Sequence, residues 1–316
     1  MLDASEKRPI LPSNSNPLGT LPARFRRQRI LIIGCGDVGL RVARLLPGRL
    51  NVMALTSSPQ RLPELRQKNI TPLLGNLDHP ATLRRLAGIA THMVHLAPPP
   101  NIAGKAITDP RTQALLRALR LRRPLSKLVY GSTSGVYGDC QGHWVTETRP
   151  ANAGTPRAQR RVDAEAQLRW YGRGSGVPVH ILRIPGIYAP DREGGTPRAR
   201  LLKGAPVLAD DDDVYTNHIH ADDLARACLA ALYRGKSQRI THVSDNTDLK
   251  MGGYFDMAAD LYGLPRPPRL ARADLAALLP AMQMSFMNES RRLSNHRLKT
   301  ELRLELRYPT VREGLA

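Results

Sequence analysis

The sequence predicts an α/β protein with a Rossmann-type, doubly wound parallel sheet and a smaller, irregular C-terminal region. Short apolar runs alternate with helical patterns from residue 29 to residue 184, a rhythm that is typical of parallel βαβ units. The first apolar run leads directly into a glycine-rich turn and an amphipathic helix. With 316 residues, 41% of them hydrophobic, the chain is long enough to bury a full core.

The individual elements follow from the periodicity of apolar residues. Short apolar runs bounded by turn residues predict strands at 30–33, 51–55, 70–74, 92–97, 127–130 and 179–184. Apolar residues at helical spacing predict helices from the glycine turn to residue 46 and at 59–67, 81–87, 107–120, 155–170 and 221–233. Further helices are expected in the C-terminal segments FDMAADLYGLP and RLSNHRLKTELRL.

The glycine turn carries the first functional prediction. Gly34-x-Gly36-x-x-Gly39 stands between a predicted strand and a predicted helix, which is the context that a dinucleotide-binding motif requires. Gly34 makes the tight turn, Gly36 lets the backbone approach a pyrophosphate, and Gly39 lets the helix pack closely on its strand. The free N–H groups of the first helical turn then face the phosphates. The cofactor-binding residues expected in this motif are Gly34, Cys35, Gly36, Asp37, Val38 and Gly39.

The end of the second predicted strand bears on the choice of cofactor. NAD-selective folds place a carboxylate there to bond the ribose 2′-hydroxyl, but this chain has Thr56, Ser57 and Ser58, followed by Arg61. Hydroxyls and an arginine suit a 2′-phosphate through charge-assisted hydrogen bonds. The alternative is that Thr56 and Ser58 only cap the next helix. We therefore expect NADP in preference to NAD.

The domain organisation follows from these patterns. Residues 1–28 are rich in Pro, Ser, Asn and Arg, so we expect a flexible basic tail. Residues 29–184 are expected to form the dinucleotide-binding Rossmann domain, to which 214–245 return. Residues 185–213 and 246–316 are expected to form the smaller substrate-side region.

Composition excludes several classes of protein. Three widely spaced cysteines indicate neither a disulfide framework nor a metal site, which suits the cytoplasm. Cys35 lies at a helix N-terminus that can lower a thiol pKa, although a small residue filling a tight loop is the interpretation we favour. No apolar run approaches the ~20 residues that span a bilayer, so no membrane partner is expected. The net charge is +20, but the arginines are spread along the chain and aromatics are only 4%, so specific nucleic-acid binding is not expected.

Several motifs together resemble the extended, atypical branch of the short-chain dehydrogenase/reductase superfamily, the epimerase/dehydratase type. They are GCGDVG, GNLDHP after the third strand, HLAPPP at the fourth and YGSTSGVYGD at the fifth, then LRIPGIYAPDR and NHIHADDLARA. The resemblance implies further cofactor-binding residues at Asn76, Leu77, Leu96, Ala97, Pro98, Arg161 and Pro185. It also implies that Thr133 bonds a substrate oxygen near the nicotinamide. It is the single ground for expecting a homodimer.

The resemblance fails at the catalytic pair. Active relatives carry Tyr-x-x-x-Lys on the helix that follows the serine loop, and aligning Glu165 with the family's helix glutamate places Arg157 and Arg161 at those positions. Their i, i+4 spacing puts both on one helical face. Arginine cannot shuttle protons at neutral pH, but Arg161 can bond the ribose and Arg157 favours an anionic ligand. A solvated basic helix face is the alternative.

Other side chains are candidate proton donors or metal ligands. Tyr188 and His220 are the substitutes for the missing tyrosine, while Tyr137 is expected to pack in its turn. His218, His220 and the following Asp222 and Asp223 also resemble a metal cluster, but the resemblance implies that this segment is structural, with the aspartates opening a helix. No metal site is expected.

Two functions of different classes remain. The first is an NAD(P)-binding oxidoreductase or epimerase-like enzyme that acts on a small anionic or sugar-like molecule, with Thr133, Arg157 and Arg161 at its catalytic centre. The second is an inactive NADP(H)-binding sensor or regulatory protein. The missing Tyr-x-x-x-Lys pair favours the sensor, and the retained Thr133 loop favours the enzyme.

Overall fold

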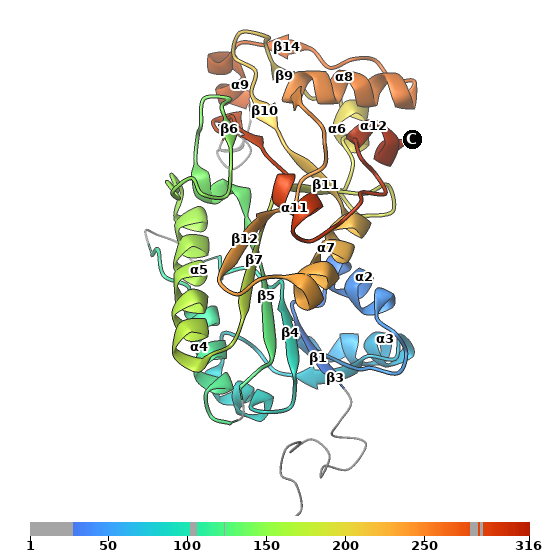
Figure 1. Ribbon diagram of the computed structural model, residues 1–316. Helices are drawn as coiled ribbons and strands as arrows, with labels where there is room; N and C mark the ends of the chain where they lie inside the picture. The colour runs from blue at the N-terminus through green and yellow to red at the C-terminus, as the bar shows by residue number, and fades with distance from the viewer. Residues whose placement is uncertain (1–27, 102–105, 123, 279–283, 285–286) are drawn as a thin grey trace, which may run out of the picture.

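The computed structural model describes residues 28–101, 106–122, 124–278, 284 and 287–316. The tail expected at 1–28 therefore lies outside the described residues except for its last position. Among the described residues, seven strands form one parallel sheet in the order β12-β7-β5-β4-β1-β2-β3 (Figure 1). This confirms the predicted doubly wound α/β fold. The strands are β1 (Arg29–Ile33), β2 (Asn51–Thr56), β3 (Thr71–Leu74), β4 (His92–His95), β5 (Lys127–Thr133), β7 (Val179–Ile184) and β12 (Arg239–His242).

Helices cover both faces of the sheet. One face packs against α2 (Asp37–Leu45), α3 (Leu62–Gln67) and α7 (Ala221–Arg234) through a core that includes Ile30, Ile32 and Val42. The other face packs against α4 (Pro110–Leu119), α5 (Pro156–Ser175) and the 3-10 helix η2 (Pro80–Leu86). Alternate residues of β1 point into opposite cores, with Leu31 and Ile33 in the second. The sheet is thus buried on both faces, as parallel sheets require.

Several elements differ in extent from the predicted ones. The helix expected at 107–120 begins at Pro110, because Asp109 accepts a hydrogen bond from the Arg111 N–H as its N-cap. Strand β5 continues to Thr133, because residues 131–133 pair with residues 182–184 of β7. Helix α5 runs five residues past the predicted end at 170, and the left-handed Gly176 ends it. The segments at 59–61 and 80–86 form 3-10 helices.

Smaller elements gather beyond the carboxyl ends of the strands (Figure 1). Tyr188, Leu201, Phe255 and Val311 belong to a separate hydrophobic cluster there. The elements of this upper region are α6 (Arg198–Leu202), β9 (Val207–Leu208), β10 (Tyr215–Thr216), β13 (Leu249–Lys250), α8 (Met251–Tyr262), β14 (Arg269–Leu270), α9 (Arg272–Leu278) and α12 (Val311–Leu315). Strands β8 (Gly186–Tyr188) and β11 (His218–His220) pair in parallel between this region and the sheet.

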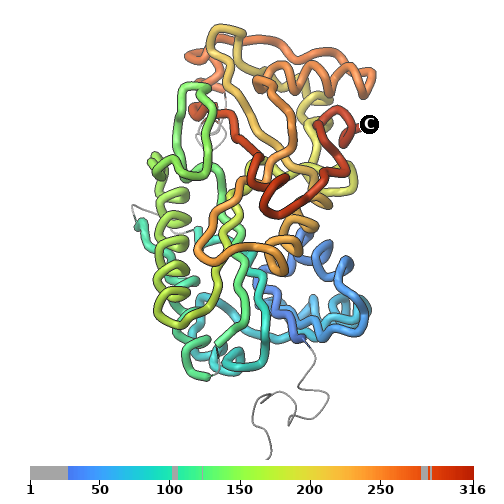
Figure 2. The backbone as a smooth tube through the Cα atoms, in the orientation of Figure 1, coloured from blue at the N-terminus to red at the C-terminus, as the bar shows by residue number. Residues whose placement is uncertain are grey.

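The C-terminal segment is shared between the two regions. Leu298, Leu302, Leu304 and Leu306 belong to the core on the α7 face of the sheet, although residues 246–316 were expected on the substrate side. Figure 2 shows this segment, which includes α11 (His296–Thr300), passing across the edge of the sheet beside β12. No helix among the described residues is both long and apolar enough to cross a membrane.

Candidate functional site

The glycine loop between β1 and α2 lies at the carboxyl edge of the sheet, where the chain order reverses. β1 pairs with β2 on one side and β4 on the other, so successive crossovers leave β1 in opposite directions. This switch point is where open α/β sheets bind their ligands. The geometry of the loop therefore decides whether a dinucleotide fits.

Each glycine of the loop meets a different surrounding. Gly34 has φ of +83°, and a Cβ there would lie 2.3 Å from the backbone nitrogen of Ala97. A Cβ on Gly39 would lie 3.0 Å from the carbonyl oxygen of Gly34, which explains the close helix packing. A Cβ on Gly36 would meet no protein atom within 4 Å. The space beside Gly36 is open for a phosphate, so the loop fits a dinucleotide.

A cleft of about 790 Å³ extends from this loop along the carboxyl ends of β2, β4, β5 and β7. It brings together most of the residues that the sequence singled out, which are Gly34, Cys35, Gly36, Asp37, Val38, Gly39, Thr56, Ser57, Ser58, Arg61, Leu96, Pro98, Thr133, Arg157, Arg161 and Pro185. Three others do not line it. Leu77 is in the core, Ala97 supports Gly34 from behind, and the Asn76 side chain accepts a hydrogen bond from the Asp78 N–H.

The polar edge of the cleft at β2 is built from short side chains. Thr56 Oγ1 accepts a hydrogen bond from the Ser58 N–H at 3.2 Å, which is a turn role, and Arg61 Nε lies 3.3 Å from Glu64 Oε2. Cys35, at the same end, is buried. Burial raises the pKa of its thiol to about 11. The interpretation of Cys35 as an activated thiol is therefore wrong, and desolvation outweighs the helix N-terminus.

The opposite end of the cleft is strongly cationic. Arg157, Arg160 and Arg161, from the first turns of α5, all line it. Arg161 Nη1 donates to the carbonyl oxygen of Gly131 at 2.7 Å and to the Tyr130 hydroxyl at 3.1 Å. Burial and then the charge of Arg161 lower the pKa of Arg157. These contacts hold Arg161 in the cleft wall, which overturns the alternative of a solvated helix face for that residue, whereas Arg157 lines the cleft but is exposed to solvent.

Thr133 lies between the two ends of the cleft. It is the last residue of β5 and the N-cap of the 3-10 helix η3 (Ser134–Tyr137), with its Oγ1 accepting from the Gly135 N–H at 3.2 Å. Because the hydroxyl acts as an acceptor in the cap, its proton remains available to donate to a ligand oxygen.

The tyrosine and histidine substitutes are engaged elsewhere. Tyr188 is buried, and its hydroxyl donates to the carbonyl oxygen of Thr310 at 3.1 Å. His220 caps α7 by accepting from the Asp222 N–H, and its ring stacks on Tyr308 at 3.7 Å. Tyr137 is buried in its turn, with its hydroxyl 2.5 Å from His242 Nε2. None of these three side chains is among the described residues that line the cleft.

The histidine and aspartate segment is structural. Asp222 pairs with Arg41, and the carboxylate of Asp223 accepts from the backbone N–H groups of Arg307 and Tyr308. Within the described ranges, no group of three or more His, Cys, Asp and Glu side chains is arranged to hold a metal ion.

Two arginines in the cleft wall, Arg160 and Arg192, were not singled out from the sequence. Arg192 belongs to the motif LRIPGIYAPDR, so the motif included the residue but did not indicate its direction. Its Nε lies 3.3 Å from Asp37 Oδ2 in the glycine loop. This contact joins residues from distant parts of the chain and has no local sequence signal.

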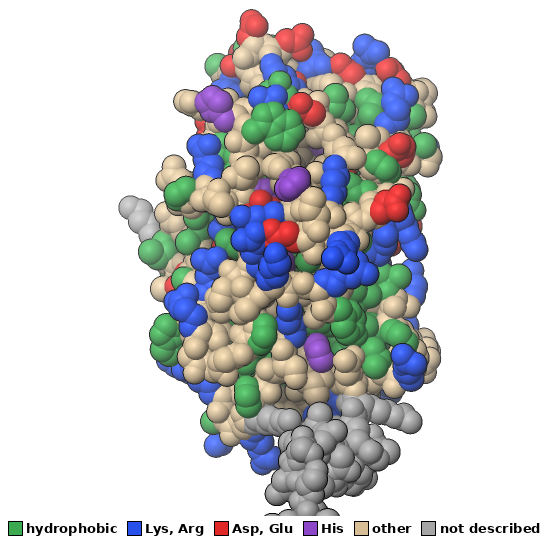
Figure 3. Space-filling view, viewed as in Figure 1, with side chains coloured by type: hydrophobic (Ala, Val, Ile, Leu, Met, Phe, Trp, Pro, Cys, Tyr) green, Lys and Arg blue, Asp and Glu red, His purple; other side chains and the backbone are tan. Residues whose placement is uncertain are grey.

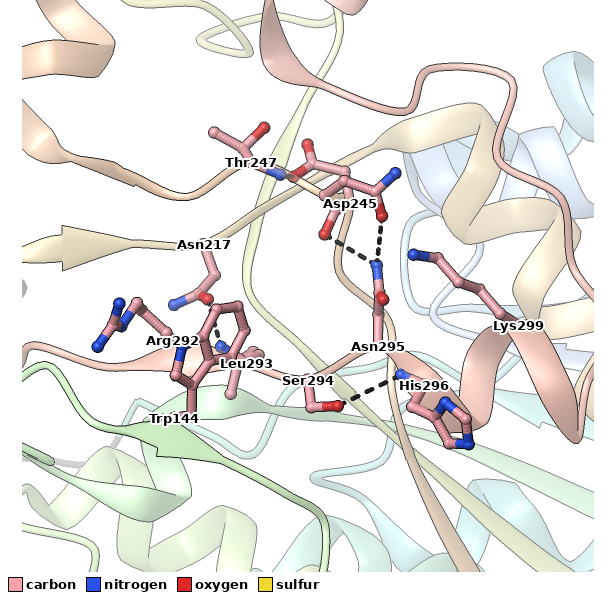
Figure 4. Close-up of a pocket in the computed structure, with 11 residues that line it drawn as sticks. Trp144, Asn217, Asp245, Thr247, Arg292, Leu293, Ser294, Asn295, His296 and Lys299 are labelled. Carbon is pink, nitrogen blue, oxygen red and sulfur yellow. Dashed lines mark hydrogen bonds between the residues drawn. The ribbon is translucent and has the colours of Figure 1, made fainter.

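A second cavity, of about 330 Å³, lies beside the paired strands β6 (Trp144–Val145) and β15 (Arg292–Leu293) (Figure 4). Its amide side chains bond neighbouring backbone. Asn217 donates to the Arg291 carbonyl and accepts from the Leu293 N–H, and Asn295 donates to the carbonyls of Ser244 and Asp245. These bonds tie the C-terminal segment to the residue before β11 (His218–His220) and to residues that follow β12, so the amides of this cavity have a structural role. We therefore place the candidate site at the glycine loop.

The fold and the cleft define a dinucleotide-binding α/β protein of Rossmann type. A sequence model of the NAD dependent epimerase/dehydratase family matches residues 30–244. The chain belongs to this family.

Individual relatives are distant. Protein YeeZ of Escherichia coli K12 is 28% identical over 147 residues, which cover 46% of this chain and 50% of YeeZ. A trifunctional UDP-glucose 4,6-dehydratase/UDP-4-keto-6-deoxy-D-glucose 3,5-epimerase/UDP-4-keto-L-rhamnose-reductase of Arabidopsis thaliana is 24% identical over 165 residues, 48% of this chain and 24% of that protein. The chain thus spans half or less of the length of these curated relatives.

Solved structures agree over most of the chain. A conserved protein of unknown function from Silicibacter pomeroyi is 28% identical with a TM-score of 0.76, covering 91% of this chain and 96% of that one. UDP-glucuronic acid 4-epimerase from Bacillus cereus, solved in complex with NAD, has a TM-score of 0.72 at 19% identity, with the same coverage. The similarity to this epimerase is a similarity of fold alone.

Proposed function

We propose that the protein is an oxidoreductase or epimerase-like enzyme that prefers NADP(H) and acts on a small anionic or sugar-like molecule. The observation that carries this proposal is the single cleft that joins the glycine loop, the Thr56–Ser58 edge, Thr133 and the arginines of α5. A nicotinamide dinucleotide bound in this cleft supplies hydride transfer. The chain's own residues then have to bind and orient the substrate and neutralise its negative charge.

The cofactor preference is supported by the edge of the cleft at β2. Arg61 and the hydroxyls of Thr56, Ser57 and Ser58 line the cleft there. Among the described residues, no carboxylate lines this edge of the cleft. An arginine and hydroxyls bind a 2′-phosphate favourably, whereas a carboxylate at this edge would repel the phosphate. The adenine-ribose end of NADP is the ligand that suits this edge.

The substrate class is supported by the other end of the cleft. Thr133 has a hydroxyl proton to donate to a substrate oxygen, and Arg157 holds a fixed positive charge close by. Arg161 stands where the family's lysine bonds the ribose and can do the same. Since arginine does not transfer protons at neutral pH, the α5 arginines are proposed to bind an anionic substrate, and the proton is supplied by another group.

The proposal is tested by titrating the protein with NADPH and NADH and measuring the rise in melting temperature. A ligand present at ~100 times its Kd adds ~2.7 kcal/mol of stability, which is a shift of several degrees. Arg61→Gln should weaken NADPH by about tenfold or more, the value of a charge-assisted hydrogen bond, and leave NADH unchanged. Arg66→Gln, which changes an exposed arginine of α3, the helix that Arg61 precedes, is the matched control. Equal weakening of both cofactors would refute the proposed role of Arg61.

The substrate class has its own test. UDP-glucuronic acid and UDP-glucose, the ligands of structurally similar proteins, differ by one carboxylate and serve as probes. Saturated with cofactor, the protein should be stabilised more by the acid, and Arg157→Met should remove that difference. A larger shift with the neutral sugar would contradict the proposed anionic preference.

A further inference from the structure

The loop that follows β8 is a compact turn that places Arg192 in the cofactor cleft. The Ala189 N–H donates to the carbonyl oxygen of Gly195 at 3.3 Å, and the Gly195 N–H donates to the carbonyl oxygen of Arg192 at 2.9 Å. A Cβ on Gly195 would lie 2.5 Å from the Ala189 carbonyl oxygen, so this position needs glycine. The backbone of the loop is therefore closed on itself.

The same loop is fastened to α2. Asp191 Oδ1 lies 2.6 Å from Arg41 Nη2, and Arg41 also pairs with Asp37 at 3.0 Å and Asp222 at 2.6 Å. Arg41 is only 6% exposed. A buried arginine that holds three carboxylates from three elements fixes the position of the loop relative to the glycine motif.

Arg192 extends from this fixed loop along the cleft wall. Its Nε lies 3.3 Å from Asp37 Oδ2, and its Nη1 donates to the carbonyl oxygen of Ile187 at 2.9 Å. Its Nη2 group has no hydrogen-bond partner within the part of the chain that the structure describes. The side chain is 30% exposed and lines the same cleft as Gly34–Gly39. One face of the guanidinium is thus held in place while Nη2 remains free to bind.

The charges around the glycine loop indicate a role for Arg192. Asp37 is the first residue of α2, in the turn whose free N–H groups are expected to face the phosphates. Arg41 also pairs with Asp37, but it is shared with Asp191 and Asp222, so one positive charge faces three carboxylates and the remaining negative charge would repel a pyrophosphate. We infer that Arg192 neutralises Asp37 and donates its free Nη2 group to the pyrophosphate of the dinucleotide. This inference rests on the proposed cofactor function and adds a ligand outside the glycine motif.

The first experiment measures the Kd of NADH, NADPH and ADP-ribose for the wild-type protein and for Arg192→Gln. Because the pyrophosphate is common to all three probes, the variant should weaken each by the same factor, about tenfold or more. Arg198→Gln changes an exposed arginine near the loop and should leave all three values unchanged. An unchanged affinity in Arg192→Gln, or a loss confined to NADPH, would overturn the inference.

A second set of variants separates direct binding from neutralisation of Asp37. If Arg192 acted only by neutralising Asp37, Asp37→Asn would restore the affinity of Arg192→Gln. Direct contact with the pyrophosphate predicts that Arg192→Gln still weakens ADP-ribose several-fold in the Asp37→Asn background. Full restoration overturns the contact. A wild-type protein that binds none of the three probes overturns the proposed function itself, so the two failures are distinguishable.

Discussion

At the residue scale, the three glycines of the motif are not equivalent. Gly34 is required by the backbone, because it has φ of +83° and abuts Ala97. Gly39 is required by packing, since its Cα faces the Gly34 carbonyl. Gly36 is under neither constraint, as a side chain there would enter empty space. The protein itself leaves this space open, which supports the proposal that a bound pyrophosphate occupies it.

This difference yields a prediction for Gly36→Val. The variant should fold with a melting temperature close to that of the wild type and lose binding of both NADH and NADPH, because the valine side chain fills the space of the pyrophosphate. Thermal titration measures both quantities. Gly34→Ala should instead lower the melting temperature, through strain and collision with backbone. A folded Gly36→Val variant with normal cofactor affinity would show that the cleft is not a dinucleotide site.

At the element scale, α5 positions the cationic end of the cleft. Its residues 157, 161 and 165 are spaced one turn apart. Glu165 forms a buried pair with Arg183 of β7 at 2.7 Å and accepts from Ser132 of β5 at 2.6 Å. Both charged side chains are about 95% buried. The pair fixes α5 against two strands. Arg161 and Arg157, one and two turns earlier on α5, are therefore held at the cleft.

We expect Glu165→Gln to be strongly destabilising. Removing one partner leaves the Arg183 charge buried without compensation, which costs about 3–5 kcal/mol. The free energy of unfolding in urea measures the loss. Asp260→Asn removes an exposed carboxylate that pairs with Arg266 and should leave the unfolding midpoint unchanged. Similar midpoints for the two variants would mean that the buried pair does not hold α5.

At the scale of the whole molecule, charges are spread over the surface and neutral imidazoles are held inside. Figure 3 shows lysines and arginines interspersed with acidic side chains over one face. His95, His180, His218 and His242 are all buried. His180 shows how they stay neutral, because Nδ1 donates to the Lys236 carbonyl at 3.1 Å and Nε2 lies 3.0 Å from the Thr241 hydroxyl. A carbonyl can only accept, so the proton is on Nδ1.

These histidines predict acid sensitivity. Burial lowers the pKa of His95 and His242 to about 3 and that of His180 and His218 to about 4. The unfolded chain, with ordinary histidine pKa values, binds more protons below pH ~6.5, so stability falls as the pH drops through that value. Each proton changes the free energy of unfolding by about 1.4 kcal/mol per pH unit. Asp245 opposes this in part, since burial raises its pKa to about 7.

The measurement is the melting temperature between pH 8 and pH 4.5. It should fall on the acid side, and His180→Gln, which removes a titrating imidazole, should reduce the slope by about one proton. A melting temperature that stays constant from pH 7.5 to pH 5 would contradict the assignment of neutral buried histidines.

Local patterns in the sequence determined the class of fold, the glycine motif and the family. The strand at 179–184 and the helix beginning at 221 agree with their predicted limits, because apolar periodicity and end signals are properties of neighbouring residues. The motif predicted which loop faces the cleft for the same reason. Asn76 and Ala97 belonged to equally good motifs but turn away from the cleft.

Tertiary structure alone decided the rest of the site. Pairing with β7 extends β5 to Thr133, and contacts of Tyr188 and His220 with Thr310 and Tyr308 remove both side chains from the cleft. The approach of Arg192 to Asp37 depends on a loop fastened through Arg41. Such contacts join residues far apart in the chain. No short segment encodes them, because the free energy that selects them arises only when the whole sheet and its covering helices are packed.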